Sequence, residues 1–294
     1  MELKLTGVSK TYPNGVKALN DVTLTIPAGM FGLLGPNGAG KSSLMRSLAT
    51  LQSIDAGTMT FGDIDIGKEP DRLRDVLGYL PQDFGVYPKV SAFDMLDHLA
   101  QLKGLANRKQ RHEVVNALLK KVNLWDVQSR RLGGFSGGMK QRFGIAQALL
   151  GDPKLIIVDE PTAGLDPAER FRFHNLLAEI AEGVVVLLST HIVSDVADLC
   201  RQMAIMNQGR VILSGHPLEL MKNLEGRIWK KFCTSAEELD ALSKALPVIA
   251  VRRVAGQRLA HVVSDGKPDG DFEPVSPDLE DVYFNALSAS AKAA

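Results

Sequence analysis

The chain has 294 residues, and its 34 lysines and arginines balance its 34 aspartates and glutamates, so the formal net charge is zero. This length favours two domains, and a neutral total provides no general electrostatic attraction for nucleic acid. The two cysteines, Cys200 and Cys233, show neither disulfide nor metal-ligand spacing, so we expect the protein to reside in a reducing cytosol. Neither a signal peptide nor a run of ~20 apolar residues is present, which predicts a soluble protein that reaches a membrane only through a partner.

The first part of the chain is predicted to form strands and one helix. Alternating apolar residues favour strands at residues 3–8 and 22–26, with turn residues at 12–15 between them. A continuous apolar run at residues 30–34 predicts a buried strand that ends in a glycine-rich loop. Apolar residues at helical spacing then predict a helix that begins near Lys41.

The middle of the chain is predicted to be an α/β core with a helical insertion. A strand ends at residues 78–82, and the polar, helical pattern from 92 to 132 predicts two amphipathic helices joined near Gly104. The core resumes with apolar strands at 155–158 and 184–188. Continuous apolar strands that alternate with helices predict a mostly parallel sheet covered by helices on both faces.

After about residue 226 the pattern changes to short strands and helices, which we interpret as a small appended α+β unit. The expected elements are a strand at 227–233, a helix at 236–246, strands at 248–254 and 258–263, and a helix from Asp278 that is frayed over residues 288–294. We therefore expect a core domain over residues 1–225, with a helical subdomain at about 86–144, and an accessory domain over residues 226–294.

A glycine-rich loop follows the first buried strand. Gly35-Pro36-Asn37-Gly38-Ala39-Gly40-Lys41-Ser42 fits the pattern G-x-x-x-x-G-K-[ST], with a strand before it and a helix after it. Glycines let backbone N–H groups turn towards phosphate oxygens, and the helix N-terminus also favours negative charge. We expect Lys41 to reach the outer phosphates and Ser42 to bind Mg²⁺. The alternative is a plain strand-to-helix turn.

Two further motifs follow later in the chain. Asp159 and Glu160 end a buried apolar strand, where an uncompensated carboxylate is costly. We expect Asp159 to hold magnesium, directly or through water, and Glu160 to polarise the water that attacks the γ-phosphate; the alternative is a solvated acidic turn before Pro161. Ser136, before two glycines, is expected to cap a second helix N-terminus that can meet phosphate, although by itself this pattern usually means only a tight turn.

Together these motifs resemble the ATP-binding cassette (ABC) ATPases over residues 2–225. Residues 35–42 resemble the Walker A loop, residues 155–160 the Walker B strand, and residues 135–142 the signature L-S-G-G-Q-x-Q-R. Gln82 stands where the family has its Q-loop glutamine, Asp166 in the D-loop, His191 as the switch histidine and Tyr12 as the aromatic that stacks on adenine. Without the family pattern, Gln82, His191 and Tyr12 would each be more easily read as structural residues.

The resemblance implies ATP and Mg²⁺ as cofactors and a set of residues for each role. The implied catalytic residues are Glu160, His191 and Lys41. Those that bind ATP in the same chain are Tyr12, Gly35, Pro36, Asn37, Gly38, Ala39, Gly40, Lys41, Ser42, Ser43 and Gln82. Those that hold the metal are Ser42, Gln82 and Asp159, and those that contact the ATP of a partner chain are Ser136, Gly137, Gly138, Met139 and Asp166.

Two residues depart from the family signature. Phe135 replaces leucine, an exchange between apolar residues, and Met139 replaces glutamine, which removes a polar group near the partner's nucleotide. Because Ser136 and both glycines remain, we expect the phosphate contact to survive. By the resemblance, two cassettes pack head to tail, so that each ATP lies between the phosphate loop of one chain and the signature of the other.

The end of the chain points to a transport role. Residues 278–284, D-L-E-D-V-Y-F, resemble the S-L-E-D-V-F ending of ATPases from type-2 ABC exporters, the daunorubicin- and antibiotic-efflux kind, although an acidic helix start is a plainer interpretation. The resemblance implies a homodimer on the cytoplasmic face of the membrane, bound to a separate polytopic permease and to no nucleic acid. The permease would dock near Phe84, Val86, Tyr87 and Pro88, which could instead belong to the core of the helical insertion.

Other roles share the catalytic motifs. An ABC importer ATPase has all of them, and only the C-terminal unit argues against it. A soluble ABC ATPase that acts on ribosomes or DNA usually has two cassettes or long coiled-coil insertions, and neither is present. A non-hydrolysing regulatory subunit is disfavoured because Lys41, Asp159, Glu160 and His191 are all intact.

Overall fold

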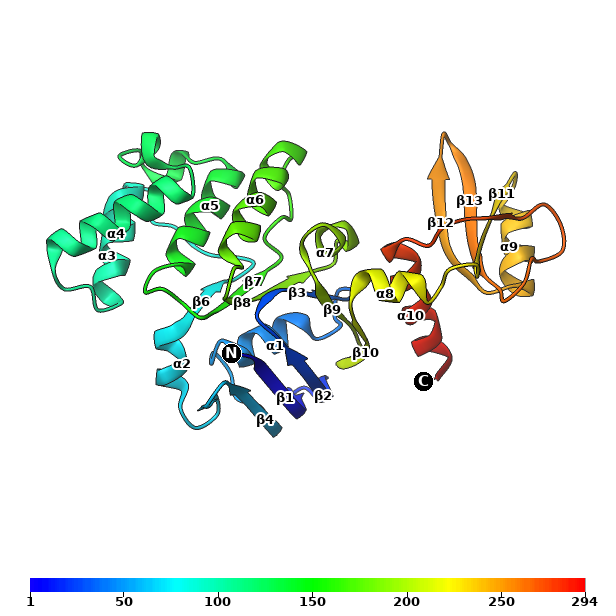
Figure 1. Cartoon of the computed structure of the whole chain (residues 1–294), viewed down its shortest axis with the longest axis horizontal. Helices are drawn as coiled ribbons and strands as arrows, with labels where there is room; N and C mark the ends of the chain where they lie inside the picture. Colours follow the sequence, from blue (N-terminus) through cyan, green and yellow to red (C-terminus); the bar gives the residue numbers. More distant parts are fainter. Residues whose placement is uncertain (294) are drawn as a thin grey trace.

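The computed structural model describes residues 1–293, and a six-stranded sheet lies at the centre of the molecule (Figure 1). Its strand order is β10-β9-β3-β8-β7-β6. The strands from β9 to β6 are parallel to their neighbours, and the edge strand β10 is antiparallel to β9. The strands are β3 (Gly29–Leu34), β6 (Leu77–Leu80), β7 (Leu155–Asp159), β8 (Val185–Thr190), β9 (Gln202–Asn207) and β10 (Arg210–Gly215). This arrangement confirms the predicted mostly parallel sheet.

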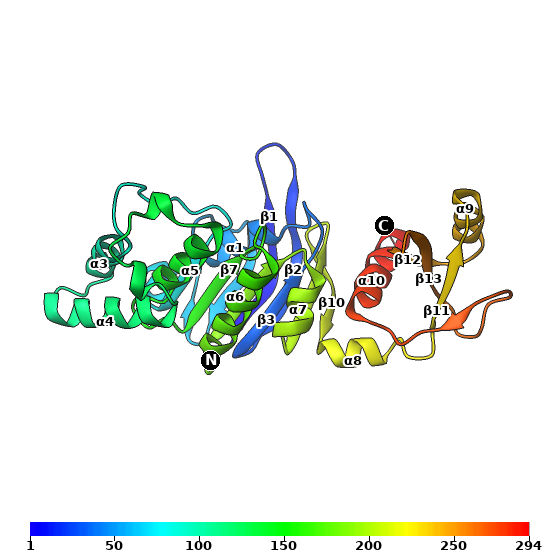
Figure 2. The same cartoon turned by 90° about the horizontal axis from the view of Figure 1, so that it is seen from above.

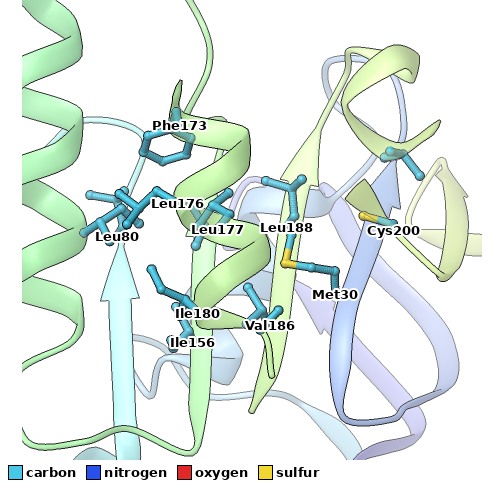
Figure 3. Packing of buried hydrophobic residues seen from close by; sticks show 14 of the residues in the cluster. Met30, Leu80, Ile156, Phe173, Leu176, Leu177, Ile180, Val186, Leu188 and Cys200 are labelled. Atoms are coloured by element: carbon cyan, nitrogen blue, oxygen red, sulfur yellow. The ribbon is translucent and has the colours of Figure 1, made fainter. Parts of the chain in front are cut away.

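Helices cover both faces of this sheet, as predicted. The helices of the core are α1 (Lys41–Leu48), α2 (Pro70–Val76), α6 (Pro167–Ile180), α7 (Val193–Leu199) and α8 (Pro217–Lys222). Successive side chains of a strand point to opposite faces. In β7, Ile157 packs in the apolar cluster that contains α1, whereas Ile156 packs in the cluster on the other face. Figure 3 shows Ile156 close to Ile180 of α6. Full burial of such a side chain contributes about 1.5–3 kcal/mol, so strands this apolar require cover on both sides.

An antiparallel sheet of order β2-β1-β4-β5 packs beside α1, and its β1–β2 hairpin projects from the molecule (Figure 2). Its strands are β1 (Leu3–Thr11), β2 (Lys17–Ile26), β4 (Ala56–Phe61) and β5 (Ile64–Asp65). β1 and β2 are longer than the predicted residues 3–8 and 22–26. β4 and β5 have no counterpart among the predicted strands, because the first residues of β4 are exposed and carry no apolar alternation.

A helical insertion lies at one end of the molecule (Figure 1). It contains α3 (Ala92–Leu102), α4 (Arg108–Lys121), α5 (Gly137–Ala148) and the 3-10 turns η1 (Trp125–Val127) and η2 (Leu132–Gly134). α3 and α4 confirm the two predicted helices, and Gly104 turns the chain between them with a φ of 90°. The expected helical pattern ends at Lys121 rather than near residue 132. Side chains of Ser91 and Asn107 cap the two helices, each by accepting a backbone N–H from the first turn.

The C-terminal unit lies at the opposite end of the molecule from the helical insertion (Figures 1 and 2). Its sheet has the order β12-β13-β11-β14. The elements are β11 (Ile228–Cys233), α9 (Ala236–Ala245), β12 (Val248–Val254), β13 (Gln257–Val263), β14 (Glu273–Pro274) and α10 (Leu279–Ala293). The predicted strands and helices are confirmed within one residue at each compared end, whereas the two-residue strand β14 was not predicted.

The expected fraying over residues 288–293 is wrong, because α10 continues to Ala293; Ala294 lies outside the described residues. The helix is held by contacts with α7, α8, β9 and β10 of the core. Ser290 also accepts a hydrogen bond from the Asn207 side chain at 3.4 Å. Because α10 returns to the core in this way, the domain boundary near residue 225 stays a prediction. Within residues 1–293, no helix has both the length and the apolar character that a membrane crossing requires.

The acidic motif at the start of α10 locks this helix to the C-terminal sheet. The carboxylate of Asp278 accepts the Asp281 backbone N–H at 2.9 Å, and that of Asp281 accepts the Asp278 N–H at 3.1 Å, which is a reciprocal helix cap. Asp281 is fully buried and also lies 2.8 Å from His261 Nδ1. Arg252 of β12 makes a two-pronged contact with the Asp278 carboxylate at 2.6 and 2.8 Å. The motif therefore has a structural role within this chain.

Candidate functional site

A cavity of about 450 Å³ lies over the phosphate loop, at the carboxyl ends of the central strands. Among the residues predicted to form the site, those that line it are Tyr12, residues 36–43, Gln82, Glu160 and His191. Gly35 and Asp159 lie behind this lining. The structure thus brings the predicted ATP-binding and catalytic residues together, although they come from the segment after β1, the loop before α1, the first turn of α1, and the segments that follow β6, β7 and β8.

The phosphate loop has a backbone that requires glycine. Gly40 has a φ of 103°, and a Cβ placed on it would lie 2.3 Å from the Ala18 carbonyl oxygen. The loop is also held by the turn that contains Gly209, because the Gly209 N–H donates to the Ala39 carbonyl at 2.9 Å. No side chain caps α1. The N–H groups of its first turn are therefore available to an anion in the cavity.

Lys41 lies at the base of the cavity, where it is almost fully buried. Its ammonium donates to the carbonyl oxygens of Gly35 at 2.7 Å and Pro36 at 3.3 Å, and it lies 3.6 Å from Glu160 Oε1. Burial lowers the pKa of Lys41, while the carboxylates of Glu160 and Asp159 oppose that change. The ammonium is therefore surrounded by oxygen atoms, which is the environment that phosphate oxygens would also supply.

Glu160 is held in an uncommon backbone conformation. Its φ is 51°, a left-handed value that costs a non-glycine residue of the order of 1–3 kcal/mol. The Glu160 N–H donates to the Ser189 carbonyl at 2.9 Å, which fixes the end of β7 against the end of β8. The result is that Glu160 Oε2 lies 2.5 Å from His191 Nδ1, between that ring and Lys41. The strained backbone thus holds the carboxylate between two basic groups, where it is well placed to act on water.

Asp159 provides a buried oxygen that suits a divalent cation. Its Oδ1 atom has no hydrogen-bond partner within residues 1–293. Burial raises the pKa of Asp159, and the nearby Glu160 carboxylate acts in the same direction. Mg²⁺ in nucleotide sites typically takes one or two protein ligands and completes its shell with phosphate oxygens and water. The Asp159 carboxylate and the Ser42 hydroxyl, which lines the cavity, fit that requirement.

Tyr12 is anchored at the outer edge of the cavity. Its hydroxyl lies 3.0 Å from Ser43 Oγ in α1 and donates to Gln52 Oε1 at 3.1 Å. These contacts fix the ring beside the phosphate loop, where an aromatic face can stack on a base. Gln82 lies in the segment after β6 and is exposed at the cavity wall.

The signature residues and Asp166 do not reach this cavity. Ser136 confirms the predicted cap, because its side chain accepts the Met139 N–H at 3.2 Å at the start of α5. Gly138 packs closely on α6, since a Cβ at this position would lie 2.3 Å from Glu169 Oε2. The Met139 side chain is half-buried and packs against the apolar cluster.

Some residues of the cavity wall have no counterpart among the residues predicted from the sequence. Gln208, in the turn between β9 and β10, lines it together with Lys17 and Ala18 of β2. Gln208-Gly209 follows Asn207, a pattern that signals a turn. Nothing in that pattern indicates that the turn folds onto the phosphate loop, because the contact joins segments that are far apart in the sequence.

Comparisons with known proteins agree on one family. A family model described as "ABC transporter" matches residues 19–163. The chain is 33% identical over 306 residues to the "Probable multidrug ABC transporter ATP-binding protein YbhF" of Escherichia coli (strain K12). This match covers 98% of this chain but only 52% of that protein. The chain thus spans about half the length of this relative.

A second relative is matched over more of its length. The chain is 34% identical over 228 residues to the "Daunorubicin/doxorubicin resistance ATP-binding protein DrrA" of Streptomyces peucetius, which covers 77% of this chain and 68% of that protein. Among solved structures, the "Dimeric structure of a post-hydrolysis state of the ATP-binding cassette MJ0796 bound to ADP and Pi" has a TM-score of 0.66 and 25% identity over 73% of this chain and 98% of that chain.

The raised pKa of Asp159 leads to a prediction on stability. A raised pKa means that the folded chain binds this proton more tightly than the unfolded chain, so stability falls as the pH rises through the raised pKa. Asp159→Asn should therefore increase the free energy of unfolding by about 1 kcal/mol at pH 7. The gain should shrink as the pH is lowered through the titration of Asp159. Urea unfolding at several pH values measures both effects.

The matched control for this prediction is Asp271→Asn, which changes an exposed aspartate and should leave the stability within about 0.5 kcal/mol of the native value. If Asp159→Asn lowers the free energy of unfolding at pH 7, the buried carboxylate is a net stabilising group and our account of its electrostatics is wrong.

Proposed function

The chain belongs to the family of ABC transporter ATP-binding proteins, which are ATPases, and from this premise we propose that it is the ATP-hydrolysing subunit of an ABC exporter. In this proposal residues 1–225 form the ATP-binding domain, and residues 226–294 form a smaller accessory domain. The observation that carries the proposal is the meeting of Lys41, Glu160 and His191 beside the phosphate loop.

The positions of these groups support a specific division of roles. Lys41 donates to oxygens of the outer phosphates, and the first N–H groups of α1 bind the remaining phosphate oxygens. Glu160 polarises the attacking water, and His191, which lies 2.5 Å away, holds the Glu160 carboxylate in its reactive orientation. Mg²⁺, when bound, would neutralise charge on the phosphate oxygens. Ser42, Gln82 and Asp159 are the residues that would hold it.

Two further contacts orient the nucleotide. Tyr12 stacks on the adenine ring, with its hydroxyl anchored to α1 through Ser43. Ser136, Gly137, Gly138, Met139 and Asp166 complete the site of a second copy. Because these residues lie outside the cavity of their own chain, a head-to-tail homodimer is the arrangement that gives them access to ATP. The exposed Ser136 and Gly137 then meet the phosphates of the partner's ATP.

The exporter role rests on the relatives and on the helical insertion. The names of two relatives, YbhF and DrrA, refer to multidrug transport and to daunorubicin resistance. We propose that a separate polytopic permease binds this chain at the cytoplasmic face of the membrane. Tyr87, with 66% of its surface exposed, offers an aromatic contact beside Pro88, whereas Phe84 and Val86 pack partly against the apolar cluster. The docking surface is thus smaller than the sequence suggests.

Removal of the proposed base should stop turnover without loss of ATP binding. In Glu160→Gln the carboxylate that polarises water becomes a neutral amide, so kcat should fall by ~10²- to 10⁴-fold. The variant should still bind ATP and accumulate as an ATP-bound dimer, which light scattering after gel filtration detects. Lys41→Ala is the control that should lose ATP binding itself. Multi-turnover hydrolysis at the native rate by Glu160→Gln would remove Glu160 from this role.

The membrane partner can be tested by isolation from native membranes. The full chain carrying an affinity tag should co-purify from detergent extracts with one polytopic membrane protein, and the permease should change its ATPase rate. Tyr87→Asp should weaken this association and leave the basal ATPase rate unchanged, because Tyr87 lies outside the cavity. Recovery of the chain on ribosomes, with no membrane protein in the extract, would contradict the exporter proposal.

A further inference from the structure

One buried carboxylate beside the catalytic residues has no place in the roles described so far. Asp195 lies in α7, four residues after His191, and its side chain is fully buried. Its two oxygens accept hydrogen bonds from four side chains. Oδ2 accepts from the hydroxyls of Thr162 at 2.6 Å and Thr190 at 3.2 Å, while Oδ1 accepts from Arg170 Nε at 2.7 Å and lies 2.8 Å from His174 Nε2.

Two of these donors stand next to the catalytic residues in the chain. Thr162 follows Glu160 by two residues, in the turn that ends β7. Thr190 directly precedes His191, and its oxygen also accepts the Ile192 N–H at 3.0 Å. The Thr190 hydroxyl therefore fixes the backbone on both sides of His191. Asp195 then ties this segment to the turn that contains Glu160.

The other two donors come from the helix that follows the D-loop. Arg170 and His174 are one turn apart on α6, which begins directly after Asp166. Asp166 is itself fixed as the cap of α6, because its side chain accepts the Glu169 N–H at 2.9 Å. Asp195 is thus the common acceptor for three segments, namely the Walker B turn, the switch loop and the helix that carries the D-loop.

The plain interpretation of this cluster is an ion pair that joins α6 to α7. The contact with Arg170 alone would satisfy that interpretation. It does not account for the two threonines, whose hydroxyls converge on the same oxygen from the turn after β7 and from the last residue of β8. Burial would raise the pKa of Asp195, but the hydrogen bonds from His174 and Thr162 and the charge of Arg170 hold that pKa below its ordinary value. The group therefore remains an ionised acceptor at neutral pH.

We propose that Asp195 is a positioning residue for ATP hydrolysis, which holds His191 against Glu160 through Thr190 and Thr162 and links both to the D-loop helix. The inference rests on the catalytic roles proposed for Glu160 and His191. It predicts that loss of the Thr190 hydroxyl impairs the chemical step while the phosphate loop still binds ATP, because none of the hydrogen bonds of Asp195 described above involves that loop.

The test compares two substitutions of Thr190 in the full chain. Thr190→Val has nearly the same shape but cannot donate to Asp195, and a misplacement of about 1 Å near a reaction centre can cost ~10²-fold. We expect kcat to fall by ~10- to 100-fold, with KM for ATP within about 2-fold of the native value. Thr190→Ser keeps the hydroxyl and should keep kcat within about 3-fold. Thr58→Val, at an exposed position of β4, is the control for the exchange itself.

A second measurement separates misplacement from poor folding. The double variant Thr190→Val/Glu160→Gln should still form the ATP-bound dimer. If Thr190→Val does not fold, Thr162→Val and Thr162→Ser replace the Thr190 pair, and kcat should again fall in the valine variant and be kept in the serine variant. Native kcat in Thr190→Val, or an equal loss in the valine and serine variants, would overturn the inference. Failure of the proposed function would look different, because Glu160→Gln alone would then still turn over ATP.

Discussion

The arrangement of this site depends on one constraint, which is that charged groups stand at the ends of strands that are otherwise buried and apolar. β7 and β8 are buried along their whole length. The buried carboxylates at the ends of these strands, and in the segments that follow them, must therefore be paired, hydrogen-bonded or used to bind a ligand. Glu160 is placed between Lys41 and His191, Asp195 is surrounded by four donors, and Asp159 keeps one oxygen without a partner. The last of these is the oxygen that we assign to Mg²⁺.

The same constraint explains the lock at the other end of the molecule. Asp281 is as deeply buried as Asp195, and it too accepts from a histidine and an arginine, His261 and Arg252. There the network holds α10 to its own sheet, whereas the Asp195 network joins the segment around His191 to the turn that contains Glu160. Removing one partner of such a buried pair typically costs 3–5 kcal/mol. The acidic motif that suggested an exporter is therefore, within this chain, a structural element that fixes the start of α10 to the C-terminal sheet.

Much of the fold and of the candidate site could be predicted from the sequence, wherever a feature depends on residues that are close together in the chain. The pattern of the phosphate loop, the apolar runs of β7 and β8, and the Ser136 cap each depend on residues that are neighbours in the chain. Gln208, Asp195 and strand β4 were not found, because their roles arise from contacts between distant segments. Asp195 illustrates the difference, since an acid in a short helix gives no sign that two threonines, one from the turn after β7 and one from the end of β8, will converge on it. The fraying expected at residues 288–293 was wrong for the same reason.

The central claim is that each ATP site is built from two chains, and mixing two defective variants tests it most directly. Lys41→Ala lacks a working phosphate loop, and Ser136→Arg blocks the surface offered to the partner, so each alone should be inactive. In a mixed dimer, the Lys41 of one chain meets the Ser136 of the other, which restores one intact site. We predict that mixing restores ATP hydrolysis in proportion to the expected fraction of mixed dimers. A mixture as inactive as its components would contradict a site shared between two chains.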